Sequence, residues 1–298
     1  AACNDFITTL GNKYPMDEYR LIRDYQNGEI IFDRRYGSTN TFEKNNYPVG
    51  YNLGQSGNTP SQNLVDAYEM IDGTPFDWNN PEHKSNPYAN RDPRLAMSIL
   101  TNNVEFKDRT IEAWTGGRDG KGVIHATRTG YYIYKFIDPN LDLLQNRTSV
   151  HHWVIMRYAE ILLSYAEAMN EAYGPTGNVG YRLNAVRALN QVRNRVGVEM
   201  PAVPTAISKE ELREKIRNER RVELAFEDHR FWDVRRWMIA PETLGAPLRG
   251  VEITKISDEE FEYNPIEVEK RTFEPKMYLY SIPQADLNTT GWVQNPLW

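Results

Sequence analysis

The chain has 298 residues and a formal net charge of −6, with 40% hydrophobic and 26% charged residues. This composition is typical of a folded globular protein of one large domain or two ordinary ones. The negative balance disfavours a general nucleic-acid binder, which needs concentrated Lys and Arg for phosphate contacts. No apolar run approaches the roughly 20 residues of a membrane-spanning helix. The single cysteine, Cys3, excludes an internal disulfide and a Cys-rich metal site.

The first residues, "AACNDFITTLG", allow two interpretations. They could be the end of a lipoprotein cleavage site in which Cys3 carries the lipid. Alternatively, Ala1 to Leu10 are the last part of a helix that ends at Gly11, because the apolar residues have the spacing of a buried helical face. We favour the helix, which implies that an N-terminal part of the full-length protein is absent.

Residues 1–150 form a loop-rich region with short periodic stretches, and from residue 12 they are rich in Asn, Gly, Pro and Tyr. The patterns predict strands within 27–37 and 131–137 and a helix over 60–73 that ends at Gly73. Two long loops lie between them, at 74–92 and 105–129. Loops longer than about 15 residues are usually functional or disordered, and these carry Trp78, Tyr88 and Trp114.

Residues 151–237 are expected to be helical. A first helix over 153–173 is apolar on nearly all sides and ends before Gly174-Pro175, and its polar stripe contains Arg157 and Glu160. A second amphipathic helix over 181–197 would pair with it as an antiparallel hairpin. Ser208 and Glu211 predict a capping box at the start of a third helix. Residues 238–298 return to loop composition, and their aromatic residues predict an ordered tail packed on the body.

The third helix continues into "RNERRVELAFEDHRFWDVRRW", which mixes many charges with large apolar residues. On one straight helix at about 100° per residue, four charges share the apolar arc, whereas five arginines point elsewhere. Buried charges must be paired, so we predict an internal ion-pair network with Arg157 and Glu160 as partners. The inward charges are Glu219, Glu223, Arg230 and Asp233, and the outward arginines are Arg213, Arg217, Arg220, Arg221 and Arg235.

Two functional alternatives for this helix are weaker. A glycosidase would use a pair of carboxyl groups from Glu219, Glu223 and Asp233. The surrounding arginines would lower their pKa values, which does not suit a general acid. A DNA-binding helix is disfavoured because acids alternate with the arginines.

The same stretch resembles the signature of the SusD/RagB family, E-R-R-x-E-[LA]-A-F-E-G-x-R-[FY]-x-D-[LV]-x-R-W. Asp228 stands where Gly is usual. Further family-like stretches are "NLVDAYEMIDG", "RDPRL", "TGYYIYKF", "RYAEILLSYAEAMNEA" and "QNPLW". The matching residues of the signature are Glu219-Arg220-Arg221, Glu223-Leu224-Ala225-Phe226-Glu227, Arg230-Phe231, Asp233-Val234 and Arg236-Trp237.

The resemblance implies a mostly α fold with tetratricopeptide-like helix hairpins and an irregular, loop-rich region that carries the ligand site. It also implies a lipoprotein on the extracellular face of the Bacteroidetes outer membrane. Such proteins bind glycans, or in some cases peptides, and deliver them to a SusC-like TonB-dependent transporter. Members are usually much longer at the N-terminus, where the lipid-bearing cysteine lies. On this basis Cys3 is not the anchor, and this chain meets the membrane only through an anchor outside it.

A sugar site needs exposed aromatic faces with polar groups at their edges. Trp78 has Asp77, Asn79 and Asn80 as neighbours, and Trp114 lies in a Gly-rich loop with Arg118 and Asp119. Both tryptophans are equally consistent with packing of their loops. Weaker candidates, for which packing is favoured, are Tyr36, Tyr51 and Tyr88; the remaining tryptophans are assigned to packing, namely Trp153, Trp232, Trp237, Trp292 and Trp298.

The histidines have no metal-ligand spacing, because His151 and His152 are adjacent. Phosphate-loop and nucleophile motifs are absent from the sequence, so we expect no cofactor, although a calcium ion held by loop Asp and Asn groups stays open. The leading hypothesis is a non-catalytic surface protein that binds an oligosaccharide or starch-like polysaccharide. The alternatives are a peptide-binding or structural lid of the transporter and, third, a glycoside hydrolase.

Overall fold

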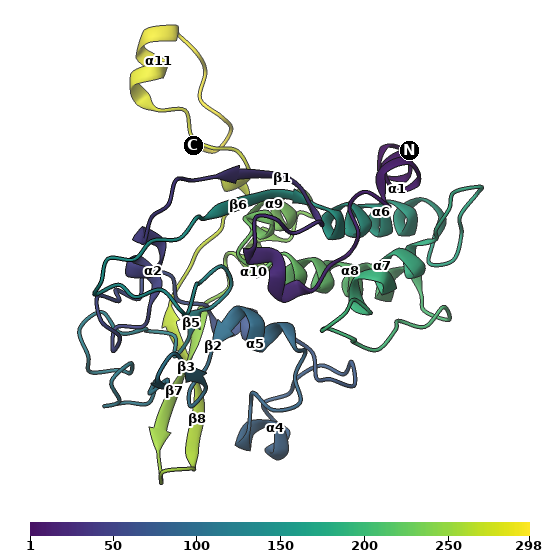
Figure 1. The fold of residues 1–298 in the computed structure, drawn as a ribbon. Coiled ribbons are helices and arrows are strands. Elements are labelled where there is room, and N and C mark those ends of the chain that lie inside the picture. The colour runs from purple at the N-terminus through teal and green to yellow at the C-terminus, as the bar shows by residue number, and fades with distance from the viewer.

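A computed structural model describes the backbone of residues 1–298 and every side chain except that of Leu21. Helices outweigh strands, at 32% and 14% of the residues. The helices α6 to α9 gather on one side, and the loop-rich first half lies beside them (Figure 1). The first half contains α1 (Ala2–Leu10), η1 (Tyr19–Arg23), β1 (Ile30–Arg35), α2 (Thr41–Asn46), α3 (Gln62–Val65), α4 (Pro81–Ser85), α5 (Arg94–Ser98), β2 (Ile99–Leu100), β3 (Glu105–Phe106), β4 (Arg109–Thr110) and β5 (Tyr132–Ile133).

The second half holds the long helices and the longest strands. Its elements are β6 (His152–Arg157), α6 (Tyr158–Tyr173), α7 (Ala185–Arg193), α8 (Lys209–Glu223), α9 (His229–Arg236), α10 (Ala240–Thr243), β7 (Leu248–Lys255), β8 (Phe261–Glu269), η2 (Pro275–Tyr278) and α11 (Gln284–Thr290). The strands pair two by two as β1–β6, β2–β5, β3–β4 and β7–β8, all antiparallel.

The helical layer is built on α6, which packs against α7, α8 and α1. Leu162, Leu163, Leu189 and Ile216 form part of its buried apolar cluster. The predicted helix hairpins and the capping box of Ser208 at the start of α8 are confirmed. In α1 one apolar face packs on this cluster, as the helical interpretation of the first residues predicts. Within the described residues, the structure has no helix long and apolar enough to cross a bilayer.

The start of the first predicted helix is a strand instead. His152 to Arg157 form β6, which pairs with β1, and the helix begins only at Tyr158. The run of β-branched and aromatic residues favours an extended backbone, and His152 and Val154 are buried from one face of it. The prediction of β1 within 27–37 is confirmed.

The straight-helix assumption for residues 212–237 is wrong. The helix is interrupted between α8 and α9, where Phe226 and Asp228 adopt left-handed φ values of 63° and 64°. Asp is among the residues that tolerate this conformation best after glycine, so the break survives without the glycine that is usual in the signature. As a result α9 does not continue the inward face of α8.

In the loop-rich region the predicted helix over 60–73 is reduced to α3, and the strand predicted within 131–137 is reduced to β5. Arg91 explains the early end of the helix. Its guanidinium donates to the backbone carbonyls of Val65 and Tyr68, at 2.7 Å and 2.6 Å, which a longer helix would use for its own ladder. A separate buried core of this region includes Tyr68, Tyr131 and Tyr132.

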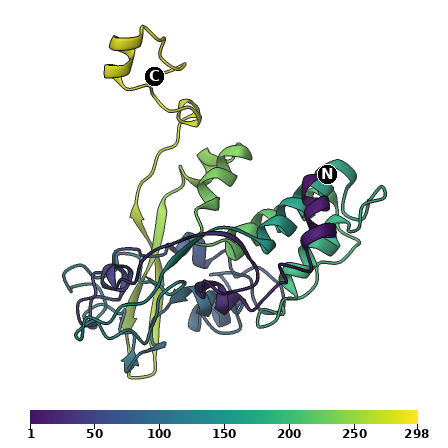
Figure 2. The same ribbon diagram turned by 45° about the horizontal axis from the view of Figure 1, so that its top comes forward.

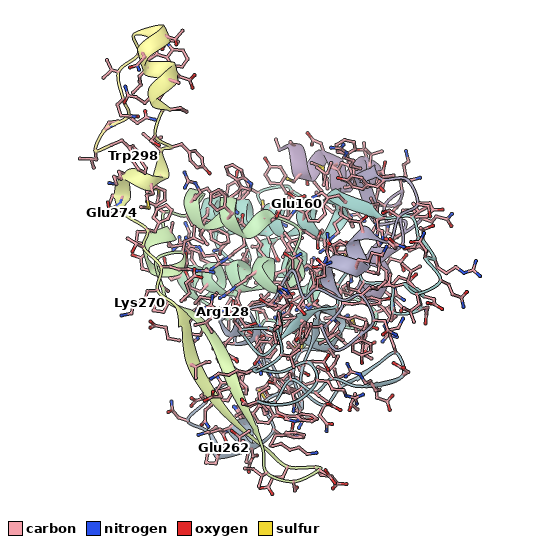
Figure 3. The ribbon with its side chains drawn as sticks, turned by 90° about the vertical axis from the view of Figure 1, so that its left-hand side faces the viewer. Arg128, Glu160, Glu262, Lys270, Glu274 and Trp298 are labelled. Atoms are coloured by element: carbon pink, nitrogen blue, oxygen red, sulfur yellow. The ribbon has the colours of Figure 1, made fainter. Side chains whose placement is uncertain are left out.

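The segment after 238 differs from the expected packed tail. Residues 248–269 form the long β7–β8 hairpin, whose alternating pattern was overlooked. After it the chain leaves the body as an arm that carries α11 (Figure 2). Figure 3 shows Glu262 toward the hairpin tip and Trp298 on the arm at the other end. Trp292 is 63% exposed and Trp232 is 61% exposed, so the packing role predicted for them is wrong in this structure.

Candidate ligand-binding cavity

A cavity of about 560 Å³ lies where the β7–β8 hairpin tip meets the α4–α5 segment and the turn after β2. Three aromatic residues line it, Tyr88, Phe261 and Tyr263, so we name it the tyrosine cavity. Amide side chains stand beside the rings at Asn102 and Asn103. The volume lies within the range typical of small-molecule sites, and flat apolar faces are combined with hydrogen-bonding groups.

The aromatic walls of the tyrosine cavity are held by edge-to-face contacts. The Tyr88 ring packs against Tyr263 at 5.4 Å and Tyr131 at 6.0 Å between centroids. The Asn102 side chain donates to the Tyr263 hydroxyl at 3.4 Å. Burial raises the pKa of Tyr263, and it raises the pKa of Tyr88 strongly, so both hydroxyls stay protonated at neutral pH. The aromatic wall of the cavity is therefore uncharged, and the charged lining residues are Arg91, Asp92, Glu259 and Glu260.

Arg91 joins this cavity to the loop that carries Trp78. Its buried guanidinium lines the cavity, and it stacks on Phe76 at 4.1 Å from the ring centroid. Burial lowers the pKa of Arg91 to about 10, which leaves it charged at neutral pH. Its donors are used on backbone carbonyls, so it fixes the wall more than it offers bonds to a ligand.

Trp78 packs behind the wall. Its indole N–H donates to the Asp66 carboxylate at 3.0 Å, and its ring meets Phe76 edge-to-face at 5.1 Å. Asp77 accepts from the backbone and the side chain of Asn79, at 2.8 Å and 3.0 Å, which closes a turn. Trp78, Asp77 and Asn79 therefore form one local cluster, but they do not line the cavity.

Trp114 does not line the tyrosine cavity but packs against Phe261, a residue of its wall. Its ring packs on Phe261 at 5.3 Å, and the Lys255 ammonium lies 5.0 Å from its centroid. Tyr36 is placed elsewhere, at the end of β1, where Arg34 stacks on it at 5.2 Å. Among the six predicted ligand residues, Tyr88 alone lines the cavity.

Helix α8 contributes Glu219 and Glu223 to a buried ion-pair network. Glu223 accepts from Arg157 and Arg195 at 2.6 Å each and from Arg94 at 2.8 Å. Glu219 accepts from Arg94 at 2.6 Å and from Arg193 at 2.8 Å. Burial alone would raise the pKa of Glu223, but the three guanidiniums hold it well below its usual range.

A second part of the network surrounds Arg157, which bonds Glu29 and Glu227 at 2.8 Å each as well as Glu223. The cations Arg157 and Lys135 outweigh the burial of Glu227 and hold its pKa at about 2. Lys135 bonds Glu227 at 2.6 Å, although burial lowers the Lys135 pKa to about 8. Carboxylates held ionised in this way do not suit general-acid chemistry.

Because the helix breaks, three predicted members of the network are placed differently. Asp233 bonds Arg220 at 2.9 Å, an arginine that we predicted to point away. Glu160 does not reach Arg157; it lies 3.8 Å from His229, and burial raises its pKa. Arg230 lies outside the network and, within the described residues, makes neither an ion pair nor a side-chain hydrogen bond. Nor do the described His, Cys, Asp and Glu residues form a group of three or more able to hold a metal ion.

The chain matches the SusD family over residues 28–298, which is most of its length. The chain belongs to this family. A SusD-like protein from Bacteroides fragilis has the same fold, with a TM-score of 0.81 and 29% identity over 100% of this chain and 61% of that one. A SusD-like carbohydrate binding protein from the same species has a TM-score of 0.79 and 28% identity, over 96% of this chain and 59% of that one.

Among curated SusD-like relatives, SusD-like protein P2 from Formosa agariphila is 34% identical over 120 residues, which are 39% of this chain and 22% of the relative. The matches thus cover less than two thirds of the relatives' length. They confirm the mostly helical SusD fold with its tetratricopeptide-like helix pairs, as the signature stretch predicts.

Several cavity and network residues of this SusD-family chain were missed by sequence reasoning. Phe261 and Tyr263 belong to an alternating run, F-E-Y-N, that could have been read as a strand with both rings on one face. Arg193 and Arg195 have no local signal, because they meet their carboxylates from other parts of the chain. Arg94 pairs locally with Asp92, but its contacts with Glu219 and Glu223 join distant segments.

Proposed function

We propose that this chain is the glycan-binding part of a cell-surface SusD-family protein that captures an oligosaccharide and delivers it to a TonB-dependent transporter. The observation that carries the proposal is the tyrosine cavity, with its aromatic walls and flanking amides. A structural relative described as a carbohydrate binding protein supports the same ligand class. Surface exposure through a lipid anchor and a SusC-like partner are parts of the proposal that rest on the family.

The cavity would contact the apolar face of a sugar ring and its hydroxyl groups through different residues. The C–H face of a pyranose ring would pack on Phe261 and Tyr88, while the exposed amide of Asn103 would bond its hydroxyls. Asn102 would support the wall, because its amide is engaged by Tyr263 and by the Ala113 N–H. All four groups are uncharged, so affinity for a neutral oligosaccharide should change little with salt. Trp114 would act from behind by holding the Phe261 ring in place.

The protein is proposed to be non-catalytic. Glu219, Glu223 and Asp233 are each engaged with arginines. Three carboxylates line the tyrosine cavity: Asp92 is bonded to Arg94 at 2.7 Å, whereas Glu259 and Glu260 are exposed to solvent near the hairpin tip. A glycosidase acid needs the opposite environment, in which burial without a cation raises its pKa. Release of reducing ends from a bound polysaccharide would contradict this part of the proposal.

The test is a titration of Phe261→Ala with neutral malto-, cello-, xylo- and manno-oligosaccharides, read by tryptophan fluorescence and by calorimetry. Loss of one stacking face should weaken a saturable hit by about tenfold. Phe32→Ala is the matched control, because Phe32 is 58% exposed on β1 and lies outside the cavity. Trp114→Ala should show a smaller loss, and Trp78→Ala should show little.

Equal affinity of the wild type and Phe261→Ala for a glycan that binds would overturn the cavity assignment. A negative result for every glycan together with a saturable peptide hit would favour the peptide-binding alternative. A negative result for both ligand classes would favour a structural lid. Including calcium in a parallel titration tests the open expectation of a structural ion.

A further inference from the structure

A second cavity, of about 630 Å³, lies between α3, the α8–α9 junction and the segment from α10 to β7. Four arginines line it, and we name it the arginine cavity. They are Arg221, Arg230, Arg249 and Arg271, and the lining also contains the carboxylates of Asp66, Asp228 and Glu242.

The pairing inside the arginine cavity is incomplete. Asp66 is engaged by Arg249 at 2.6 Å, and its other oxygen accepts from Gln62 at 2.7 Å and from Trp78. Arg221 donates to the backbone carbonyl of Asn63. Over the described part of the chain, no carboxylate lies within ion-pair distance of Arg221 or Arg230.

This arrangement differs from that of the ion-pair network. Arg91 also meets no carboxylate of the described residues, but its donors are used on backbone carbonyls. In the network, the guanidiniums of Arg94 and Arg157 each meet two or more carboxylates, and that of Arg220 meets Asp233. In the arginine cavity, burial and, to a smaller extent, repulsion by Arg230 together lower the pKa of Arg221 to about 10. Burial also lowers the pKa of Arg230. Two desolvated cations that repel each other would be stabilised by an anion between them.

The shape and the apolar lining of the cavity limit the kind of anion. A planar guanidinium binds carboxylate or sulfate oxygens through two parallel hydrogen bonds. The volume is in the range of sites for small organic molecules, which is larger than one inorganic oxyanion requires. Apolar surface comes from Leu64, Phe226 and Phe231. A ligand that fits has both an apolar face and an anionic group.

We propose that the arginine cavity binds an acidic sugar, with Arg221 and Arg230 holding its carboxylate or sulfate-ester group. The sugar part of the ligand rests on the proposed glycan-binding function, whereas the oxyanion part rests on the two unpaired guanidiniums alone. Asp228 and Glu242 are exposed carboxylates of the cavity lining, and both would oppose the anion.

Calorimetry at constant ionic strength tests this on the whole chain with trigalacturonate, its methyl ester, a 6-O-sulfated galactose disaccharide and the unsulfated disaccharide. Arg230→Gln should weaken binding of one acidic probe by about tenfold or more, since a charge-assisted bidentate contact is lost. The neutral probes should not respond to this substitution. Which acidic probe binds distinguishes a carboxylate from a sulfate ester.

Arg187→Gln is the matched control, because Arg187 is exposed on α7 and takes part in no ion pair of the described residues. Arg230 has no partner to lose, so Arg230→Gln should leave the melting temperature unchanged or raise it. Asp228→Asn should tighten acidic binding by about twofold or more, because a like charge is removed from the rim.

Equal effects of Arg230→Gln and Arg187→Gln on a bound acidic probe would overturn the proposal. So would binding of inorganic sulfate without binding of either acidic sugar. Loss of the acidic probe in Phe261→Ala but not in Arg230→Gln would place it in the tyrosine cavity, which overturns the acidic site and leaves the glycan-binding function standing. If no neutral glycan binds and an acidic probe binds in a way that depends on Arg230, the tyrosine cavity is rejected as a glycan site and the arginine cavity stands.

Discussion

Replacement of Glu223 by Gln should be among the most destabilising single changes in the chain. The carboxylate is fully buried and accepts from three guanidiniums, Arg94, Arg157 and Arg195. Gln keeps the shape but removes the charge, so three buried cations lose their shared partner. Breaking a buried pair by removing one partner typically costs about 3–5 kcal/mol. We expect the free energy of unfolding to fall by about that amount.

Urea denaturation measures the change, with tryptophan fluorescence and far-ultraviolet circular dichroism recorded together so that a single transition can be verified. The matched control is Glu214→Gln on the same helix. Glu214 bonds Arg217 at 2.8 Å, but its side chain is 69% exposed, so its loss should cost only about 0.5 kcal/mol. A cost for Glu223→Gln below about 1 kcal/mol, equal to that of the control, would refute the view that this network is a buried, mutually dependent set of charges.

Three further changes are expected. The stability contributed by ionised Glu227 should be fully present above pH 4.5 and should be lost as the pH falls toward 2, because the unfolded chain binds this proton more readily than the folded chain. The pKa shift from 4.5 to about 2 corresponds to about 3 kcal/mol. Glu227→Gln should therefore flatten the pH dependence of the unfolding free energy measured in urea. Gly130→Ala should lower the free energy of unfolding by about 2 kcal/mol more than Gly116→Ala. Both glycines have left-handed φ values, +86° and +89°, so the backbone strain is matched. A Cβ at position 130 would lie 2.8 Å from the Val251 carbonyl oxygen, whereas a Cβ at position 116 would have no neighbour within 4 Å among the described residues. Equal costs would contradict that steric explanation. Ser208→Ala should lower the unfolding free energy by about 1 kcal/mol through loss of the α8 cap, and an unchanged denaturation midpoint would argue against it.

The helical layer could be predicted from sequence because its signals are local. Apolar spacing located α6 and α7, and Ser208 marked the start of α8. The break after α8 was not predictable from periodicity, since it depends on left-handed backbone at Phe226 and Asp228. That single turn moved Arg230 out of the network and brought Arg220 into it.

The site was less predictable than the fold because cavities are made by segments distant in sequence. Tyr88 and Tyr263 are 175 positions apart in the numbering, yet their rings are in edge-to-face contact. Trp78 and Trp114 looked like the best sugar platforms, but composition cannot distinguish a ring that faces a ligand from one that supports its neighbour. The alternation of aromatic and polar residues within 261–264 was the one overlooked signal for β8, the strand that supplies Phe261 and Tyr263 to the cavity wall.

The ion-pair network also has a consequence for the order of folding. Arg94 meets Glu219 across 125 positions of sequence, and Arg195 meets Glu29 across 166. A guanidinium that leaves water before its carboxylates arrive is unstable, so these contacts are expected to close late, after α6 to α8 have assembled. Contacts absent from the transition state slow unfolding without speeding folding. The network should therefore act mainly as a kinetic lock on the folded chain, and Glu223→Gln should raise the unfolding rate far more than it lowers the folding rate.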